Sequence, residues 1–398
     1  MNITIDLVIT TGIAALVVLL GNFIVDRVKV FRDFCIPAPV VSGLLVSIIL
    51  CILKVNHILS VKWTATLGGW SMNLFLTAVG FGFTADLIKK GGKLCAKISI
   101  ITVILITLQD IVGVFLAKIA GVHPLIGLSC GSLSMYGGVG TAAAFGPIFE
   151  KLGCDGATAI GVAAGTFGMV VASLCGGPAA RFLIRRDSLK PGPEDAAPAD
   201  NKDKKTVHPL NVKRMSNAFF LLLMTGGIGG PIYMLLKHIP DIEVPYFLGC
   251  LIAGVIVRNT MESLHKDCYV EEMNVLSHLI LYLFIAITIM TLDLTKLFSV
   301  AGAMSMILIG EVIVTVLLAV IVAYPVYGKS YNAAVMVAGL IGTGLGATPN
   351  AVANEKAVID EFGYAHIAWI LFPGMAVLAG NIYNPLFVTL IEKFVANL

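Results

Sequence analysis

Charged residues are scarce in this chain of 398 residues. Asp, Glu, Lys and Arg together make up 13% of it, whereas hydrophobic residues make up 58%. Soluble domains carry about a quarter charged residues, so this composition excludes an ordinary soluble protein. The mean hydropathy is +0.93. The sequence therefore predicts a protein that crosses a membrane several times.

Several motifs with known chemistry are also missing. The eight cysteines stand singly, without a CxxC pair or a Cys/His cluster, which excludes a disulfide framework and a zinc site. No Gly-Lys-Ser/Thr follows the glycine-rich strings and no predicted strand precedes them, which argues against nucleotide binding. A nucleophile with its base is not apparent, which argues against an enzyme. We expect no cofactor and no nucleic-acid partner.

Apolar runs long enough to cross a bilayer form two sets of five. No basic region precedes the first run, so we interpret it as a retained helix and not a cleaved signal peptide. The runs are 3–25, 36–53, 67–85, 98–120 and 157–184, then 216–236, 244–257, 275–292, 303–326 and 366–391. A polar stretch rich in Pro, Gly and Lys separates the sets. We predict an N-terminal repeat, a linker and a C-terminal repeat at 1–184, 185–214 and 215–398.

Two glycine-rich segments occupy corresponding places in the two halves. They are Tyr136–Thr141 and Thr343–Pro349. Asp86-Leu87 and Asp293-Leu294 are separated by the same number of positions as Thr141 and Thr348, which indicates a duplication. We expect both aspartates to cap helix ends. A pair of broken segments at matching places is the best sequence pointer to a transporter's binding site.

The distribution of basic residues predicts the topology. With the N-terminus outside, five crossings in the first half place the basic linker in the cytoplasm, as the positive-inside rule requires. All but seven of the 27 Lys and Arg then lie on the cytoplasmic side. An odd number of crossings inverts the second repeat. The predicted fold is therefore an all-α polytopic membrane protein with two inverted-topology repeats, each of five transmembrane helices plus one re-entrant hairpin, at about 124–149 and 332–354. Both chain termini are predicted to lie outside.

The broken segments carry backbone and neutral oxygens suited to ligands. Irregular backbone at membrane depth is tolerated where it lines a cavity or is buried in protein, and helix ends at a break can hold anions or cations. Small residues also serve helix packing, the commoner role for one such run, but two matched runs favour binding. The predicted substrate-binding residues are Ser132, Ser134, Gly137, Gly138, Gly140, Thr141, Gly344, Gly346, Thr348 and Asn350.

Polar residues inside apolar helices are candidate sodium ligands. Asp110 follows Gln109 in an apolar helix and is costly to bury charged, which makes it a functional candidate. The alternative is a packing hydrogen bond, and for Glu311 the two interpretations are balanced. Asn381 and Asn384 lie on one helical face. The predicted sodium ligands are Gln109, Asp110, Thr343, Asn354, Asn381 and Asn384.

Several strings resemble the bacterial sodium/glutamate symporter family. They are Gly-Gly-Val-Gly-Thr (137–141), Gly-Thr-Phe-Gly-Met (165–169), Gly-Gly-Pro-Ala-Ala-Arg (176–181), Gly-Leu-Gly-Ala-Thr-Pro (344–349) and Ala-Val-Ala-Asn (351–354). The resemblance covers essentially the whole chain. It implies sodium-driven import of L-glutamate, two opposed re-entrant hairpins that meet at the substrate, a homodimer, and a mobile domain that moves against a dimerising one.

The chain departs from the family pattern at a few positions. Tyr136 and Val139 stand where the family carries Ser and His, and Leu340 stands where a His is common. Asn381 replaces an Asp, and Asp110 replaces an Asn. The resemblance therefore supports the fold and the ion more strongly than the substrate.

We expect an inner-membrane symporter that couples sodium to a small anionic amino acid, glutamate first. A symporter of the same fold for a di- or tricarboxylate, with protons carried by Asp110, stays open. A passive channel and an intramembrane enzyme are the alternatives from other classes. The expected partners are L-glutamate or a similar anion, Na⁺, the lipid bilayer and a second copy of the chain.

Overall fold

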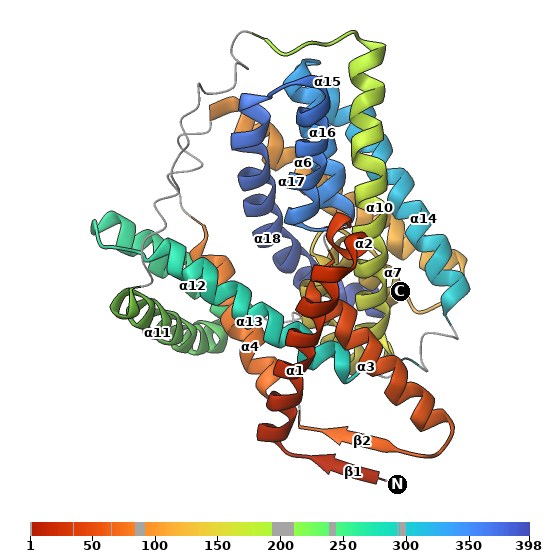
Figure 1. Ribbon diagram of the computed structural model, residues 1–398, viewed down its shortest axis with the longest axis vertical. Helices are drawn as coiled ribbons and strands as arrows, with labels where there is room; N and C mark the ends of the chain where they lie inside the picture. The colour runs from red at the N-terminus through yellow and green to blue at the C-terminus, as the bar shows by residue number, and fades with distance from the viewer. Residues whose placement is uncertain are drawn as a thin grey trace.

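The computed structural model describes residues 2–34, 36–64, 66–83, 92–192, 211–238, 244–292, 294 and 300–398. Asp86 and Asp293, which we expected to cap helices, lie outside the described residues, as does most of the predicted linker. Among the described residues the chain is almost entirely helical (Figure 1).

The first half contains the helices that the apolar runs predict, together with a first broken segment. Its elements are β1 (Asn2–Ile5), α1 (Leu7–Arg27), α2 (Lys29–Asp33), α3 (Ala38–Val55), β2 (Ser60–Trp63), α4 (Thr66–Phe81), α6 (Gly92–Ile119), α7 (Pro124–Cys130), α8 (Ser132–Met135), α9 (Gly138–Lys151) and α10 (Ala157–Arg186).

The second half also contains helices at its apolar runs and a broken segment before its last long helix. Its elements are α11 (Val212–Leu236), α12 (Tyr246–Ser263), α13 (Val270–Met290), α14 (Ala301–Leu317), the π-helical turn η3 (Leu318–Ala323), α15 (Tyr324–Tyr327), α16 (Tyr331–Leu345), α17 (Thr348–Phe362) and α18 (His366–Ala396).

Each of the ten predicted apolar runs contains a helix, although the first run begins in strand β1 and the third extends beyond the described residues. Eight helices in the described part of the chain are long and apolar enough to cross a membrane, with α14, η3 and α15 counted as one. Of the helices in the other two runs, α4 has only 16 residues, and α12 has 18 residues like α3 but carries Arg258 and Glu262 in its last turns. Both glycine-rich segments break their helices, as predicted.

A short parallel sheet is the one departure from the all-α prediction. Strand β1 pairs with β2 from Asn2↔Ser60 to Ile5↔Trp63. We expected the first helix to begin at residue 3, but α1 begins at Leu7 because Asp6 caps it, accepting a hydrogen bond from the Ile9 amide at 2.8 Å. The sheet places the start of α1 and the α3–α4 connection at the same end of the molecule (Figure 1).

The helices pack into two groups. In the first, α1 contacts α3, α11 contacts α12, α4 contacts both α12 and α13, and α13 contacts α3. In the second, α6, α10, α14 and α18 surround the broken segments. Figure 1 shows the first group in the lower part of the view and the second in the upper part. The two broken segments therefore belong to the same group.

Candidate functional site

The second broken segment is an antiparallel helical hairpin. A Cβ built on Gly342 of α16 would lie 2.5 Å from the Cα of Ala351 on α17. At the other end of the hairpin, the Tyr331 hydroxyl donates to the Gly363 carbonyl at 2.5 Å. The start of α16 and the end of α17 therefore lie together at the base of the hairpin. Its tip is the break at Gly346.

The first broken segment is interrupted twice. Gly131 separates α7 from α8, and Gly137 separates α8 from α9. The adjacent Gly138 has φ +67°, in the left-handed region that side chains rarely adopt. Glycine is thus required by the backbone conformation at the start of α9.

The two breaks meet. A Cβ built on Gly138 would lie 3.4 Å from the carbonyl oxygen of Gly346 and 3.8 Å from the Cβ of Ala347. On α10, a Cβ on Gly165 would lie 3.0 Å from the Val139 amide nitrogen, and one on Gly168 only 2.2 Å from the Leu345 carbonyl oxygen. Glycines on α10 therefore allow both breaks to approach its backbone closely.

The bases of the two broken segments lie at opposite ends of α10. At its start, the Thr158 amide donates to Glu150 Oε1 of α9 at 3.2 Å. At its other end, Arg181 forms an ion pair with Glu361 of α17, with Nε and Oε2 2.6 Å apart. Since the 30 residues of α10 span about 45 Å, the segments approach its middle from opposite ends.

Three predicted site residues form one buried cluster beside the first break. The Ser132 amide donates to Asp110 Oδ1 at 3.0 Å. Its hydroxyl donates to Asn384 Oδ1 at 2.8 Å, and Asn384 Nδ2 donates to the Ser132 carbonyl at 2.9 Å. All three side chains are buried. The cluster joins α6, α8 and α18.

Gln109 extends this cluster to the second broken segment. Its Nε2 donates to the Gly344 carbonyl at 2.6 Å and to Thr315 Oγ1 at 3.0 Å. The carbonyl belongs to the last turn of α16, where C-terminal oxygens are free to accept bonds. Gln109 thus ties α6 to the end of α16 and to α14.

The two predicted asparagines of α17 lie apart from this cluster and face α10. Asn350 Nδ2 lies at 3.0 Å from both the Met169 carbonyl and Ser173 Oγ, and at 3.1 Å from the Phe34 carbonyl. Asn354 Nδ2 donates to the Ala172 carbonyl at 3.0 Å. Their amide nitrogens hold α17 against α10, while Asn350 Oδ1 has no partner among the described groups.

The other predicted residues divide into enclosed and accessible ones. Ser134 donates to the Gly161 carbonyl at 2.8 Å, and Thr343 donates within its own helix to the Gly339 carbonyl at 3.2 Å. Gly344 and Gly346 are buried at the tip of the second hairpin. The accessible residues, half-buried or exposed, are Gly137, Gly140, Thr141, Thr348 and Asn381.

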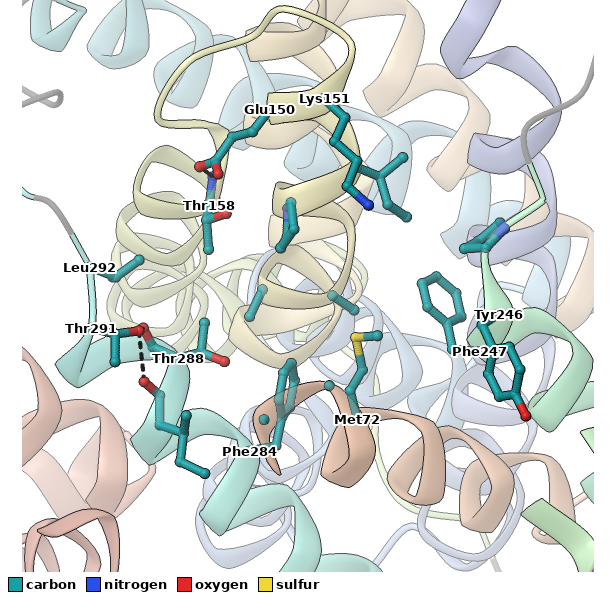
Figure 2. Close-up of a pocket in the computed structure, with 18 of the residues that line it drawn as sticks. Met72, Glu150, Lys151, Thr158, Tyr246, Phe247, Phe284, Thr288, Thr291 and Leu292 are labelled. Atoms are coloured by element: carbon teal, nitrogen blue, oxygen red, sulfur yellow. Dashed lines mark hydrogen bonds between the residues drawn. The ribbon is translucent and has the colours of Figure 1, made fainter. Parts of the chain in front are cut away.

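A cavity of about 680 Å³ lies between the two helix groups. Glu150 and Lys151 of α9 line it on one side, and Thr288 of α13 and Thr291, just after that helix, line it on the other (Figure 2). It lies at the end of α10 where that helix begins, because Thr158 is also part of its wall. The cavity is therefore on the same side as the base of the first broken segment.

Apolar side chains of the helices that line the cavity also lie against α9 near the first break. Met72 of α4 and Phe284 of α13 line the cavity (Figure 2). About one helical turn away along these helices, Phe75 and Leu281 lie next to Gly140. A Cβ on that glycine would be 3.2 Å from Leu281 Cδ1 and 3.9 Å from Phe75 Cε1. Two side chains of the first helix group thus lie over α9 near the break.

Sequence reasoning missed several residues of the site. Thr315 was not selected, although a polar pair four residues apart, Glu311 and Thr315, was a usable signal in an apolar helix. The Tyr136 hydroxyl donates to the Ala376 carbonyl of α18 at 2.7 Å. Since its partner lies in the other half of the chain, no local pattern points to that bond.

Comparison with known proteins gives the family. The family model described as sodium/glutamate symporter matches residues 3–364. The chain belongs to the sodium/glutamate symporter family. It is 33% identical to the sodium/glutamate symporter of Escherichia coli (strain K12) over 392 residues, which cover 97% of each chain. It is 35% identical to that of Haemophilus influenzae over 384 residues, or 94% of each.

Family membership confirms the resemblance on which part of the prediction rested. Members of this symporter family are membrane transporters and not enzymes. Together with the eight apolar helices, this makes the chain an integral membrane protein with a transport function.

Proposed function

We propose that this chain is a sodium-coupled secondary symporter that imports L-glutamate across the bacterial inner membrane. The observation that carries the proposal is the contact between the two breaks, where Gly138 faces the Gly346 carbonyl oxygen. Non-helical backbone at membrane depth is found where it is buried in protein or lines a cavity. The names of the relatives in E. coli and H. influenzae support sodium and glutamate as the transported species.

In this proposal the fold consists of two inverted-topology repeats, each with five transmembrane helices and one re-entrant hairpin. The opposite positions of the two hairpin bases along α10 support it. In the proposed repeats α3 corresponds to α12, and α4 corresponds to α13. The packing agrees with this correspondence, since α3 contacts α13 and α12 contacts α4. Arg181, Arg185 and Arg186 mark the cytoplasmic end of α10 by the positive-inside rule. Both chain termini then lie outside.

Alternating access follows from the two helix groups. The group that holds both broken segments, α6–α10 with α14–α18, is the mobile domain. The group of α1, α3, α4 and α11–α13 stays fixed and forms the homodimer. The cavity beside Glu150 and Lys151 lies between the groups, at the outer end of α10, and serves as the external entrance. Movement of one group against the other would open the breaks to either side.

The roles of the site residues follow from their accessibility and partners. Gly137, Gly140, Thr141 and Thr348 lie on the accessible side of the breaks and contact the substrate. Gly138, Gly344 and Gly346 let the backbones approach, and Ser132, Ser134 and Asn350 hold the breaks in place. Sodium is bound by oxygens of Gln109, Asp110, Thr343, Asn354, Asn381 and Asn384.

Coupling requires a difference between loaded states. A ligand shifts a conformational equilibrium only by its differential affinity for the two states. Sodium alone must therefore hold the mobile domain in place, and the substrate must release it. The mobile domain then moves across the membrane when it is empty or fully loaded. It does not move when it holds sodium alone.

Uptake by reconstituted vesicles tests this proposal. Purified protein in proteoliposomes would be given labelled L-glutamate, D-glutamate, aspartate, succinate and citrate, each with an inward sodium gradient or with choline in its place. We expect accumulation of L-glutamate with sodium only. Sodium-driven accumulation of succinate or citrate, but not of glutamate, would identify a di- or tricarboxylate symporter instead. Uptake that never exceeds equilibration would indicate a channel.

A further inference from the structure

Two buried carboxyl groups in the mobile domain lie near the same turn of α7 and have no ion-pair partner among the described residues. Glu311 of α14 is 0% exposed and Asp110 of α6 is 1% exposed. Both carboxylate oxygens of Glu311, and Oδ2 of Asp110, have no hydrogen-bond partner among the described groups. Asp110 accepts the hydrogen bond from the Ser132 amide with Oδ1, so this bond does not involve Oδ2.

The two side chains face the same short helix. Helices α6, α7 and α14 contact one another pairwise. A Cβ built on Gly131, at the end of α7, would lie 3.1 Å from Asp110 Oδ1, and one built on Gly113 of α6 would lie 3.1 Å from Glu311 Oε1. A Cβ on either glycine would also meet the same carbonyl oxygen, that of Gly127 on α7. The two carboxyl groups therefore share one small region at this three-helix contact.

Among the described residues, neither carboxyl group is paired with a basic side chain. An uncompensated charge inside a protein or a bilayer costs several kcal/mol. Both charges must therefore be neutralised: one Na⁺ balances one carboxylate, and a proton on the other carboxyl balances the second.

Further oxygen is available next to the pair. Gln109, adjacent to Asp110, reaches Thr315, which lies one turn beyond Glu311 on α14. Its amide nitrogen is used by Thr315 and Gly344, but its Oε1 has no partner among the described groups. Hard cations such as sodium are bound by oxygen ligands, and the number of charged ligands tunes their affinity.

We propose that Glu311 and Asp110 together form a sodium site at the contact of α6, α7 and α14, with Gln109 Oε1 as a neutral ligand. This inference rests on the proposed sodium coupling and adds to it a ligand, Glu311, on the second repeat. A sodium ion there would connect α6 to α14 and thereby join the two halves of the mobile domain. Because Gln109 also holds Gly344, the site is connected to the second break.

Sodium-dependent thermal stability of the full-length protein in detergent tests the site. The probes are NaCl, KCl and CaCl₂, each compared with choline chloride at equal ionic strength. Ligand binding to the folded state raises the unfolding temperature as the ligand concentration exceeds its dissociation constant. We expect a sodium-specific rise for the wild type, and at least a tenfold higher half-maximal sodium concentration for both Glu311→Gln and Asp110→Asn.

Glu392→Gln is the matched control. Glu392 is also 0% exposed, but it lies near the end of α18, two turns beyond Asn384. Its replacement should leave the half-maximal sodium concentration unchanged. If Glu311→Gln responds to sodium like the wild type, or if calcium or potassium stabilises the wild type as well as sodium does, the sodium site is wrong and protons neutralise the pair or another cation binds it.

A second readout separates this inference from the proposed function. Glutamate uptake by the wild type tests the function, whereas the sodium concentration for half-maximal uptake by Glu311→Gln tests the site. Glutamate uptake with an unchanged sodium requirement in the variant would overturn the site alone. Sodium-specific stabilisation that depends on Glu311, in a protein that does not transport glutamate, would support the site and refute the substrate.

Discussion

Ser132 and Asn384 hold each other through two hydrogen bonds. The serine hydroxyl donates to the amide oxygen at 2.8 Å, and the amide nitrogen donates back to the serine carbonyl at 2.9 Å. The Ser132 amide in turn donates to Asp110. This chain of bonds fixes α18, in the second half of the chain, against the first break. It places the two helices that carry the Asp110 and Asn381 departures beside one polar region.

The first prediction concerns those departures. Asp110→Asn should raise the sodium concentration for half-maximal uptake about tenfold, or by about 1.4 kcal/mol, because a neutral amide compensates the cation less. Adding Asn381→Asp should recover part of the loss, since it returns a carboxylate to the same region. Sodium titrations of uptake measure this. No recovery in the double variant would show that the two positions act independently.

The glycines at the breaks give a second prediction. A Cβ on Gly346 would lie 2.9 Å from the Asn350 amide carbon and 3.0 Å from the Gly342 carbonyl oxygen. Gly346→Val should therefore abolish uptake while the protein stays folded in the membrane. Gly140→Val should do the same, because its Cβ would lie 3.2 Å from Leu281 Cδ1 beside the break. Gly374→Val is the control, because nothing lies within 4 Å of a Cβ at that position. Near-normal uptake by the break variants would identify these glycines as packing residues.

The opposite entry of the hairpins gives a third prediction. In a protein freed of its eight cysteines, a Cys at Thr141 should react with an impermeant thiol reagent mainly from outside, and one at Thr348 mainly from the cytoplasm. Cys at the exposed Asn56 and Ser188 would report the outer and inner faces. Reaction at both hairpins from one side only, in every ligand state, would contradict the inverted arrangement.

The side chains over Gly140 give a fourth prediction. Leu281 lies beside Gly140, about one turn from the Phe284 that lines the cavity. Leu281→Ala should therefore increase the rate at which a Cys at Thr141 reacts from outside. Leu279→Ala, on the exposed face of the same helix, should not change it. Equal rates in both variants would mean that Leu281 does not close this path.

Asn350 gives a fifth prediction, on stability. It is 0% exposed, and its amide nitrogen lies within 3.1 Å of three acceptors. Asn350→Ala leaves these buried acceptors without their donor, which costs about 1–3 kcal/mol. Asn397→Ala removes an exposed amide and should have little effect. Thermal inactivation of solubilised protein compares the two, and equal temperatures would show that the bonds to α10 contribute little.

Local patterns predicted the helices and both breaks. Long apolar runs determine where helices form, and the glycines at 137, 138 and 346 interrupt these helices. Both effects are local and do not depend on how the rest of the chain packs. The exception is β1, because Ile3 and Ile5 belong to the same apolar run as α1. Only Asp6 marks the true start of that helix.

Contacts between distant segments could not be predicted in the same way. Gln109 was selected as a sodium ligand, but its bond to Gly344 depends on how α6 packs against α16. Asn354 was selected for its oxygen, whereas its amide nitrogen is bonded to α10. For Glu311 the sequence left a functional and a packing interpretation equally supported. The functional one became favoured only because the structure places Glu311 near Asp110.

Concentrative uptake driven by one gradient at a time tests the central claim most directly. Proteoliposomes would receive labelled L-glutamate with an inward sodium gradient at equal pH, or with an inward proton gradient and no sodium. The proposed coupling predicts accumulation above the external concentration in the first case only, and collapse when a sodium ionophore is added. Equal accumulation under the proton gradient without sodium would contradict it.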